Sequence, residues 1–369
     1  MLGDKARFPA VLVFLLSACA YPAAGTPPAI QPPTETLRPT LMPTETPVLS
    51  SDVAFMERPS PDSIRVISYN GYWDSIFAAE DPDNSDLREY DRAASFARMM
   101  RALQPDVLCL QEINYLRGTR KTGEFLATIL GEDQPWQVVN VRDNVIATRF
   151  HLVEHGFELI TGSFLPDLRQ AAALIDLPNE VSGPPDLYMI CAHFKAGGSM
   201  DDIQLRTRQG DAIAAHVGDA VTPGGEFDLP AGTPIVVLGD FNIYSTDPAL
   251  HLRAMVHGDI YDEAFFGEDV PPDWDSTSFT DVLPSHNGLG DLFYTWRNDI
   301  VSLVPGTLDR VFYSDSVLQV ENSFILNTTL LSVSALEILG LERDDVILDP
   351  ATGFYDHLPL VVDFVILSR

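Results

Sequence analysis

The chain has 369 residues, with 53 acidic and 23 basic residues and a formal net charge of −30 at pH 7. Long-range attraction to duplex DNA is therefore excluded as a driving force, although bound cations could still support a local contact with nucleic acid. About three hundred residues remain after the first fifty, which is enough for one large core.

Residues 1–18 have the composition of a signal peptide. Lys5 and Arg7 accompany an apolar run that is too short to span a bilayer as a permanent helix. The segment Leu16-Ser17-Ala18-Cys19 resembles the bacterial lipobox, in which the cysteine is acylated. We therefore expect cleavage before Cys19, a lipid on Cys19 and a lipoprotein at the outer face of the bacterial membrane. A chance cysteine at this position is the alternative.

Residues 19–51 are rich in Pro, Thr and Ala, as in Thr26-Pro27-Pro28. Such a segment cannot form a core, and it samples extended conformations. The sequence predicts a tether over residues 19–51, followed by one catalytic domain over residues 52–369.

Short apolar runs alternate with helical patterns along this domain, which indicates an α/β or α+β layered fold. The predicted strands are Ile64–Tyr69, Val107–Gln111, Asn144–Thr148, Leu187–His193, Ile235–Gly239, Arg310–Tyr313 and Leu360–Ile366. The predicted helices are Leu87–Leu103, Phe125–Leu130, Asp202–His216 and Pro248–Met255. Most strands are apolar on both faces, so we expect two packed sheets with outer helices. The segment Val256–Gly290 has weak periodicity and is interpreted as an insertion or loop near a site.

The chain has three cysteines. Besides Cys19, these are Cys109 and Cys191, and both lie inside apolar strand-like runs. The sequence favours buried free thiols at these two positions, and therefore no disulfide framework.

Polar residues recur where the predicted strands end or begin. They are Asn70, Gln111-Glu112, His193-Phe194-Lys195, Gly239-Asp240-Phe241-Asn242, Leu308-Asp309-Arg310 and Asp356-His357. Each has an ordinary structural explanation when taken alone: asparagine and aspartate cap turns, and histidine is often a core residue. Together they form a set that such explanations do not account for.

Four of these segments resemble the signature of the endonuclease/exonuclease/phosphatase superfamily, in the same chain order. They are Ser68-Tyr69-Asn70, Gln111-Glu112, Gly239-Asp240-Phe241-Asn242 and Asp356-His357. The resemblance runs from about Arg65 to the C-terminus. It implies a four-layer sandwich, in which two packed mixed β-sheets are flanked by helices. It also implies hydrolysis of phosphoester bonds, as in deoxyribonucleases, abasic-site endonucleases, neutral sphingomyelinases and inositol-polyphosphate phosphatases.

A phosphodiester is a poor electrophile, so its hydrolysis needs positive charge at the phosphoryl oxygens and a positioned water. Mg²⁺ supplies such charge and prefers oxygen ligands, and Mn²⁺ or Ca²⁺ is an alternative. By resemblance, Glu112 is the principal metal ligand, Asp356 is a second, and Asn70 is an orienting neighbour.

The resemblance also makes His357 the histidine that faces the phosphate, with Asp309 bonded to its far ring nitrogen. Asp240 would orient or deprotonate the water, and Asn242 would donate to the phosphate. Either Asp240 or His357 could be the base. His193 matches deoxyribonuclease-like and sphingomyelinase-like members, in which it serves as general acid, and not the abasic-site enzymes.

Two cations, Lys195 and Arg149, are candidate phosphate contacts, and a surface role is the alternative for each. A competing metal site at Asp81-Pro82-Asp83-Asn84-Ser85-Asp86 lacks the glycine and the trailing glutamate of a calcium loop, so a solvated acidic turn is expected.

We therefore expect a divalent-metal-dependent phosphodiester hydrolase, first of all a cell-surface nuclease. A sphingomyelinase or phospholipase C is the rival enzyme, and its membrane-contacting loop could include Phe265, Phe266 and Trp274. A binding module that keeps the fold without turnover is the non-enzymatic alternative. The expected partners are the phosphodiester substrate, nucleic acid or phospholipid, and the membrane that holds the lipid.

Overall fold

The computed structural model describes residues 51–153, 168, 170–178, 186–243, 249–301 and 303–367. Leu49–Arg369 form one compact unit. The predicted signal peptide, Cys19 and residues 20–50 of the tether lie outside the described residues. No helix in the described ranges is long and apolar enough to cross a membrane.

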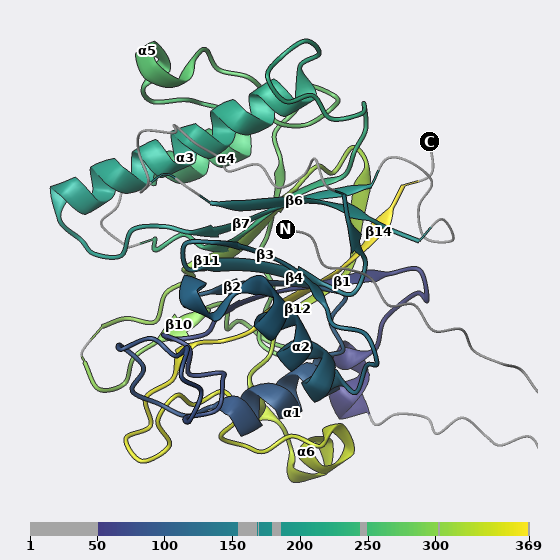
Figure 1. Cartoon of the computed structure of the whole chain (residues 1–369), viewed down its shortest axis with the longest axis vertical. Coiled ribbons are helices and arrows are strands. Elements are labelled where there is room, and N and C mark those ends of the chain that lie inside the picture. Colours follow the sequence, from purple (N-terminus) through teal and green to yellow (C-terminus); the bar gives the residue numbers. More distant parts are fainter. Residues whose placement is uncertain are drawn as a thin grey trace, which may run out of the picture. The chain divides into compact units, whose positions relative to one another are not determined.

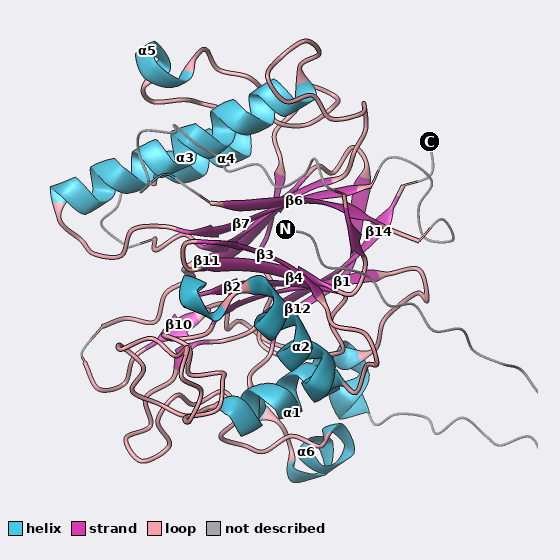
Figure 2. Cartoon of the chain, in the orientation of Figure 1, coloured by secondary structure: helices cyan, strands magenta, loops and turns pink. Residues whose placement is uncertain are grey.

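Two six-stranded mixed sheets lie at the centre of this unit (Figure 2). The first has the order β12-β14-β1-β2-β4-β3 and the second the order β5-β6-β7-β8-β11-β9. The first sheet contains β1 (Ile64–Asn70), β2 (Val107–Gln111), β3 (Gln137–Val141), β4 (Asn144–Thr148), β12 (Leu318–Ile325) and β14 (Leu360–Ile366). The second contains β5 (His151–Leu152), β6 (Ala171–Asp176), β7 (Leu187–His193), β8 (Ile235–Asp240), β9 (Thr280–Val282) and β11 (Asp309–Tyr313). A separate short pair joins β10 (Trp296–Arg297) to β13 (Asp356–His357).

Each sheet has one parallel pair in its middle, β1 with β2 and β7 with β8, and antiparallel neighbours on both sides. The carboxyl ends of two parallel strands meet at the same edge of a sheet. The two parallel pairs therefore bring four of the polar strand ends together, two from each sheet.

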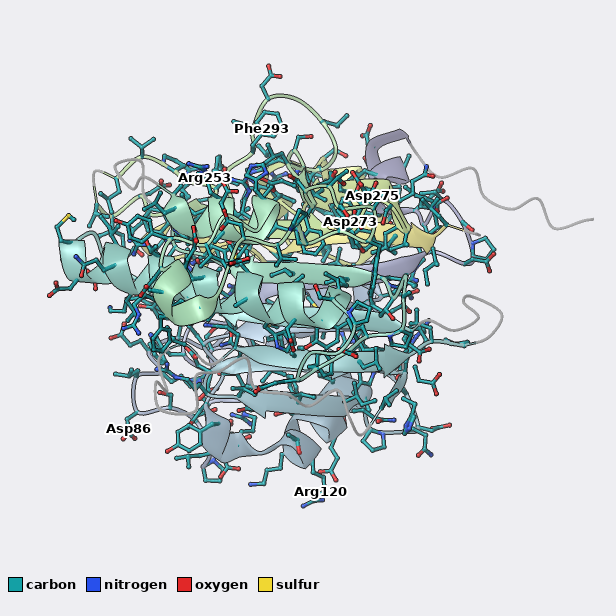
Figure 3. The ribbon with its side chains drawn as sticks, turned by 90° about the horizontal axis from the view of Figure 1, so that it is seen from above. Asp86, Arg120, Arg253, Asp273, Asp275 and Phe293 are labelled. Carbon is teal, nitrogen blue, oxygen red and sulfur yellow. A yellow bond between two sulfur atoms is a disulfide. The ribbon has the colours of Figure 1, made fainter. Side chains whose placement is uncertain are left out.

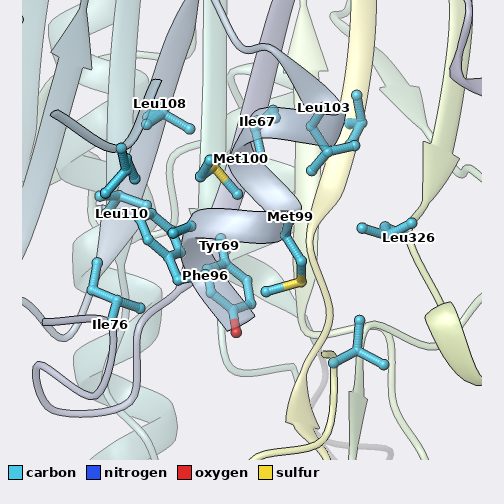
Figure 4. Packing of buried hydrophobic residues seen from close by; sticks show 14 of the residues in the cluster. Ile67, Tyr69, Ile76, Phe96, Met99, Met100, Leu103, Leu108, Leu110 and Leu326 are labelled. Atoms are coloured by element: carbon cyan, nitrogen blue, oxygen red, sulfur yellow. The ribbon is translucent and has the colours of Figure 1, made fainter. Parts of the chain in front are cut away.

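Helices cover the outer faces of the two sheets, so the unit has the four layers expected (Figure 1). The helices are α1 (Ala93–Leu103), α2 (Thr119–Leu130), α3 (Met200–Val221), α4 (Leu250–His257), α5 (Glu263–Phe266) and α6 (Val333–Leu339). Helices α1 and α2 pack on the first sheet, where Phe96 and Met99 contact Tyr69 and its neighbours (Figure 4). Helices α3 and α4 pack on the second sheet through Ile213 and Met255.

The inner core lies between the two sheets and contains Val66, Ile146, Met189 and Val236. Strands with a core on each face need apolar side chains at successive positions, which explains the continuous apolar runs in the sequence. Burial of each large aliphatic side chain contributes about 1.5–3 kcal/mol to folding.

The predicted helix Leu87–Leu103 begins later than expected, at Ala93. The reason is that Arg92 is fixed to the core: its backbone N–H donates to Ser75 O at 2.7 Å, and its guanidinium bonds Tyr69 and Asp345. Residues 87–92 therefore lead to this fixed position and do not form a turn of helix. Strands β3, β5, β6, β9, β10, β12 and β13 were not predicted.

Cys109 and Cys191 form a disulfide that joins β2 to β7. Their burial was predicted correctly, but the prediction of free thiols is wrong. The two residues are 82 positions apart, and they become neighbours because β2 and β7 belong to facing sheets and both turn these side chains into the inner core. A contact across two sheets leaves no local signal in the sequence.

The segment Val256–Gly290 contains α5 and β9 and packs on α3 and the second sheet. Asp211 of α3 accepts the backbone N–H groups of Tyr261 and Asp262 at 2.9 and 3.0 Å. Among the predicted membrane-contacting residues, Phe266 and Trp274 pack against the core, while Phe265 is exposed.

Candidate active site

The carboxyl ends of the two parallel pairs form one cluster that bridges the sheets. Asn70 is opposite Gln111 in the first sheet, and His193 is opposite Asp240 in the second. The Asn70 amide joins the two sides, because Nδ2 donates to Glu112 Oε1 at 3.0 Å and to Asp240 Oδ2 at 3.3 Å. Its own Oδ1 accepts the Tyr72 backbone N–H at 3.0 Å, which fixes the orientation of the amide.

Three of the clustered side chains are carried on left-handed backbone, with φ of 60° at Glu112, 50° at Asn242 and 67° at Asp356. This region is uncommon for residues with a Cβ and costs of order 1 kcal/mol or more at each. Gly239 has φ of 143°, and a Cβ there would lie 1.9 Å from Ala192 O. A glycine is thus required for β8 to approach β7 just before Asp240.

His357 is held between two carboxylates. Its Nδ1 lies 2.8 Å from Asp309 Oδ2, and its Nε2 lies 3.4 Å from Asp240 Oδ2. Asp309 is itself fixed by the Thr295 hydroxyl, which accepts the Asp309 backbone N–H at 2.9 Å. Burial alone would lower the pKa of His357, but the charges of Asp309 and Asp240 hold this pKa well above its usual range. The ring is therefore held between the two carboxylates, with Nε2 toward Asp240.

His193 forms a second histidine–carboxylate pair on the other side of Asp240. Its Nδ1 lies 2.7 Å from Asp143 Oδ2, and its Nε2 lies 3.7 Å from Asp240 Oδ2 and 3.9 Å from Glu112 Oε1. Burial lowers the pKa of His193, but the bond to Asp143 and its charge outweigh burial and raise this pKa to about 9. Asp143 precedes β4 and was not among the predicted residues.

Glu112 and Asp356 fit a hard divalent cation by their chemistry, and Asn70 donates to Glu112 beside them. Burial and the nearby charge of Asp356 raise the pKa of Glu112, although His193 and Asn70 oppose this. Burial also raises the pKa of Asp356, and Trp296 Nε1 donates to Asp356 Oδ1 at 3.0 Å. Buried carboxylates that repel one another are relieved by a bound cation, and oxygen donors suit Mg²⁺.

A second grouping overlaps this one. Asp240, Asp309 and His357 place one donor atom each within 4.8 Å of one another. The cluster as a whole thus has two adjacent positions where a cation is chemically suited, one toward Glu112 and Asp356 and one between Asp240 and His357.

Two pockets open onto the cluster. The first has a volume of about 440 Å³, and its wall includes Glu112, Asp240 and His357 together with Leu303 and Val304. The second, of about 340 Å³, shares Glu112 and His193 and adds the side chains of Trp73, Arg142 and Lys195. A phosphodiester that reaches the histidines would therefore meet an apolar wall on one side and two cations on the other.

The two predicted phosphate contacts have different positions. Lys195 lines the second pocket, with Nζ 3.4 Å from Asp202. Arg149 lies at the opposite edge of the first sheet, where it is paired with Asp106. The reason is strand direction: β4 runs antiparallel to β2, so Thr148 pairs with Val107 at the start of β2, far from Glu112. The structure does not bring Arg149 to the cluster.

The acidic turn at residues 81–86 is not simply solvated. Asp81 pairs with Arg117, Asp83 pairs with Lys121, and Asn84 Oδ1 accepts from Arg117 at 2.6 Å. The backbone N–H of Ser85 donates to Asp74 at 2.6 Å. The charges of Asp81 and Asp83 are thus balanced by cations of the protein.

Residues 67–330 match the model of the Endonuclease/Exonuclease/phosphatase family. No curated protein matches the chain. Similar solved structures include the endonuclease/exonuclease/phosphatase from Beutenbergia cavernae, at 19% identity over 82% of this chain and 72% of that one, with a TM-score of 0.47. The human Nocturnin catalytic domain with bound sulfate is 20% identical over 83% of this chain and 95% of that one, with a TM-score of 0.45. D. rerio TDP2 complexed with a single-strand DNA product is 14% identical over 82% and 98%, with a TM-score of 0.45.

Proposed function

The chain belongs to the endonuclease/exonuclease/phosphatase family, whose members are hydrolases acting on phosphoester bonds, and we propose that it is a divalent-metal-dependent phosphodiester hydrolase. One observation carries this proposal. Asp240 lies between two histidines, at 3.4 Å from His357 and 3.7 Å from His193, and each histidine is held by its own carboxylate. Such an arrangement can move one proton from a water and another to a leaving group.

Glu112 and Asp356, with Asn70 beside them, would hold the cation, which we propose to be Mg²⁺, with Mn²⁺ or Ca²⁺ as alternatives. The bound ion would supply positive charge at the phosphoryl oxygens. Trp296 orients Asp356 by its hydrogen bond, as second partners of metal ligands commonly do.

Asp240 would position and deprotonate the attacking water beside His357, whose raised pKa keeps that ring protonated. Asp240 Oδ1 is fixed by the backbone N–H of Asn242 at 2.9 Å, which leaves Oδ2 turned toward both histidines. Asn242 Nδ2 gives one hydrogen to Phe194 O at 3.0 Å, and its second hydrogen would donate to a phosphate oxygen. Asp309 fixes the tautomer of His357 and stabilises its protonated form.

His193 would give its proton to the leaving oxygen. Its pKa near 9 keeps the ring protonated at neutral pH, as a general acid requires. In this step the water oxygen forms a bond to phosphorus and its proton goes to Asp240. The phosphorus–oxygen bond to the alcohol breaks, and the alcohol takes a proton from His193. Asp143 would act as the positioning residue of His193.

The test is turnover of bis(p-nitrophenyl) phosphate by the purified protein with Mg²⁺, Mn²⁺ or Ca²⁺ and with a chelator. Asp240→Asn and His357→Gln should each lower kcat by roughly 10²–10⁴-fold. Asp259→Asn and His257→Gln change the same residue types at the end of α4 and just after it, where His257 is exposed and Asp259 is half-exposed, and should have no effect. Equal turnover by all variants would refute the assignment of the site, and turnover that persists after chelation would refute the dependence on a metal. No turnover by any of them would favour a binding module on this fold.

We further propose that the protein is exported and held at the membrane by a lipid on Cys19. The disulfide between β2 and β7 supports export, because such bonds persist mainly in oxidising compartments. Labelling of growing cells with a radioactive fatty acid should mark the wild type and not Cys19→Ala. Labelling of both would contradict the anchor.

A cell-surface nuclease is the candidate that the sequence placed first. The observation that favours it is the second pocket, in which Trp73 could stack on a base while Arg142 and Lys195 contact phosphates. Hydrolysis of plasmid DNA or RNA, with a loss in Trp73→Ala, would support it.

A further inference from the structure

The proposed metal ligands and the proposed proton-transfer groups are carried by different sheets. Glu112 follows β2 of the first sheet, and Asp356 lies in β13, just before β14 of the same sheet. His193 and Asp240 end β7 and β8 of the second sheet. A phosphodiester held by the cation would therefore meet its general acid only if the two sheets keep a fixed separation.

The disulfide lies one layer below this cluster. Cys109 and Cys191 face the inner core from β2 and β7. Side chains two positions apart on a strand share a face and are separated by about 6.6 Å. Two residues beyond the disulfide layer, on β1, β2, β7 and β8, lie Asn70, Gln111, His193 and Asp240. Gln111 Nε2 joins the two layers, at 2.8 Å from Cys109 Sγ and 3.6 Å from Cys191 Sγ. The bond thus supports the cluster directly.

The two sheets approach each other closely at this bond. Face-to-face sheets ordinarily pack about 10 Å apart, whereas the Cα atoms of Cys109 and Cys191 are 5.4 Å apart. A disulfide requires such a short distance. Two apolar side chains in its place would not require it, so without the bond the sheets can relax toward the ordinary spacing. The short side chains of Asn70 and Asp240 meet across this narrow gap, with 3.3 Å between Nδ2 and Oδ2.

Gln170 makes a second, polar connection between the sheets. Its buried Oε1 accepts the His193 backbone N–H at 2.9 Å and the Asn144 Nδ2 amide at 3.2 Å. Asn144 begins β4 of the first sheet, and Gln170 directly precedes β6 of the second. The backbone of the general acid is thus bonded to the first sheet one residue away from Asp143, which holds its ring at 2.7 Å.

The side chains of the cluster have little freedom to compensate for a movement of the sheets. Exposed charges such as Asp86 and Arg120, at the outer edge of the molecule in Figure 3, can change rotamer in solvent. By contrast, Asp240 is buried, and His193 is held both at Nδ1 and at its backbone N–H. A shift between the sheets therefore changes the distances in the cluster directly, and a misplacement of about 1 Å can lower a rate by about 10²-fold.

We propose that the Cys109–Cys191 disulfide and Gln170 are positioning groups, which hold the sheets at the separation at which His193 reaches the leaving oxygen of an ester bound beside Glu112. In this arrangement His193 Nε2 lies 3.9 Å from Glu112 Oε1. The proposal rests on the hydrolase function proposed above. Both groups act through His193.

The test compares two diesters that differ in their need for a general acid. p-Nitrophenolate leaves readily without a proton, whereas phenolate is more basic and needs one. In Cys109→Ala/Cys191→Val, which replaces the disulfide by apolar side chains, kcat for diphenyl phosphate should fall by about 10²-fold and kcat for bis(p-nitrophenyl) phosphate by less than about tenfold. Gln170→Met should change the ratio of the two rates in the same direction. A loss of folded protein lowers both rates by one factor and leaves their ratio unchanged.

Two controls separate positioning from stability. Met189→Ala opens a cavity in the same inner core, two residues before Cys191, and keeps the disulfide. It should lower the melting temperature and leave the ratio of rates unchanged. In a His193→Gln background, which already lacks the acid, the two cysteine substitutions should change the ratio no further, because both changes act through one side chain.

Failure of the positioning role differs from failure of the hydrolase function. An unchanged ratio in a folded Cys109→Ala/Cys191→Val protein, or an equal change in Met189→Ala, overturns the positioning role while the hydrolase stands. If the double variant does not fold, Gln170→Met decides by the same criterion. No turnover of either ester by the wild type refutes the hydrolase function itself.

Discussion

Two acidic regions of the molecule differ in how their charge is balanced. In the turn at residues 81–86, Arg117 and Lys121 neutralise Asp81 and Asp83, and hydrogen bonds from Asp83 N–H and Arg117 lower the pKa of Asp81 despite its partial burial. At the strand ends, burial and Asp356 raise the pKa of Glu112.

The difference shows that a run of acids in the sequence is a poor guide to a metal site. The acidic residues of the turn lie close together in the sequence, yet Asp81 and Asp83 are already paired with cations of the protein. The strand-end carboxylates come from separate parts of the chain and face histidines and one another, so a cation has the most to contribute there. The predictions that follow test this contrast.

Glu112→Gln should have the largest effect. Loss of the central carboxylate should lower kcat/KM for bis(p-nitrophenyl) phosphate by roughly 10³-fold, about 4 kcal/mol, and abolish the rise in melting temperature caused by Mg²⁺. The double variant Asp81→Asn/Asp83→Asn should keep both properties. A Mg²⁺-dependent rise that survives in Glu112→Gln and vanishes in the turn variant would reverse the assignment.

Arg117→Met should be next, and it should act on stability. The buried guanidinium lies 3.3 Å from the centre of the Phe77 ring and bonds both Asp81 and Asn84. Its removal leaves Asp81 without its main partner, and we expect a loss of about 3 kcal/mol in the free energy of unfolding. Urea unfolding measures this loss, and turnover per folded molecule should not change. A stable protein with reduced turnover would be the opposite of what we expect.

The histidines differ in the same way, because the pKa of His216 is lowered whereas the pKa values of His193 and His357 are raised. His216, half-buried beside Tyr188 and Phe227, has its pKa lowered from 6.5 to about 4 by burial, against a smaller opposing effect of Asp219. A lowered histidine pKa means that the unfolded chain takes up a proton first, so stability is full above pH 6.5 and falls as the pH drops toward 4.

In urea unfolding, the wild type should lose about 1 kcal/mol more than His216→Gln between about pH 7 and about pH 5, since the ring is only half-buried. An equal loss in both proteins would show that other groups account for the acid sensitivity.

The smallest effect is expected for Lys121→Gln. Its ion pair with Asp83 is half exposed, so solvent screens it and its removal should cost less than about 0.5 kcal/mol. The same urea experiment measures this, with Arg117→Met as the reference. A loss as large as that of Arg117→Met would mean that the turn depends on both cations equally.

The central strands could be predicted from the sequence because each is a short apolar run bounded by turn residues. Strands β2, β4, β7 and β14 have the predicted bounds. Strand β6 was missed because Ala171–Asp176 is rich in alanine, which has little preference for a strand. Strand β12 was missed because Glu321 and Asn322 interrupt its apolar pattern at a bulge.

The same reasoning explains what was found and what was missed at the site. Asn70 and His193 were predicted because each ends a predicted strand and resembles a site position of the family. The structure brings them together because residues that end parallel strands meet at one edge. Arg149 also ends a strand, but β4 runs antiparallel to β2, so the site edge receives the residue before β4, Asp143, and not the one after it. Strand direction is a tertiary property, and so is the pairing of Cys109 with Cys191.

The disulfide between Cys109 and Cys191 closes a covalent ring in the chain. A protease that cuts the backbone anywhere between residues 110 and 190 would leave the two fragments joined, with β2 still attached to β7. Such a nicked molecule would run as one species on a gel without reductant and as two with it. For the exported protein that we propose, a single cut within the ring would therefore not separate the molecule into two pieces.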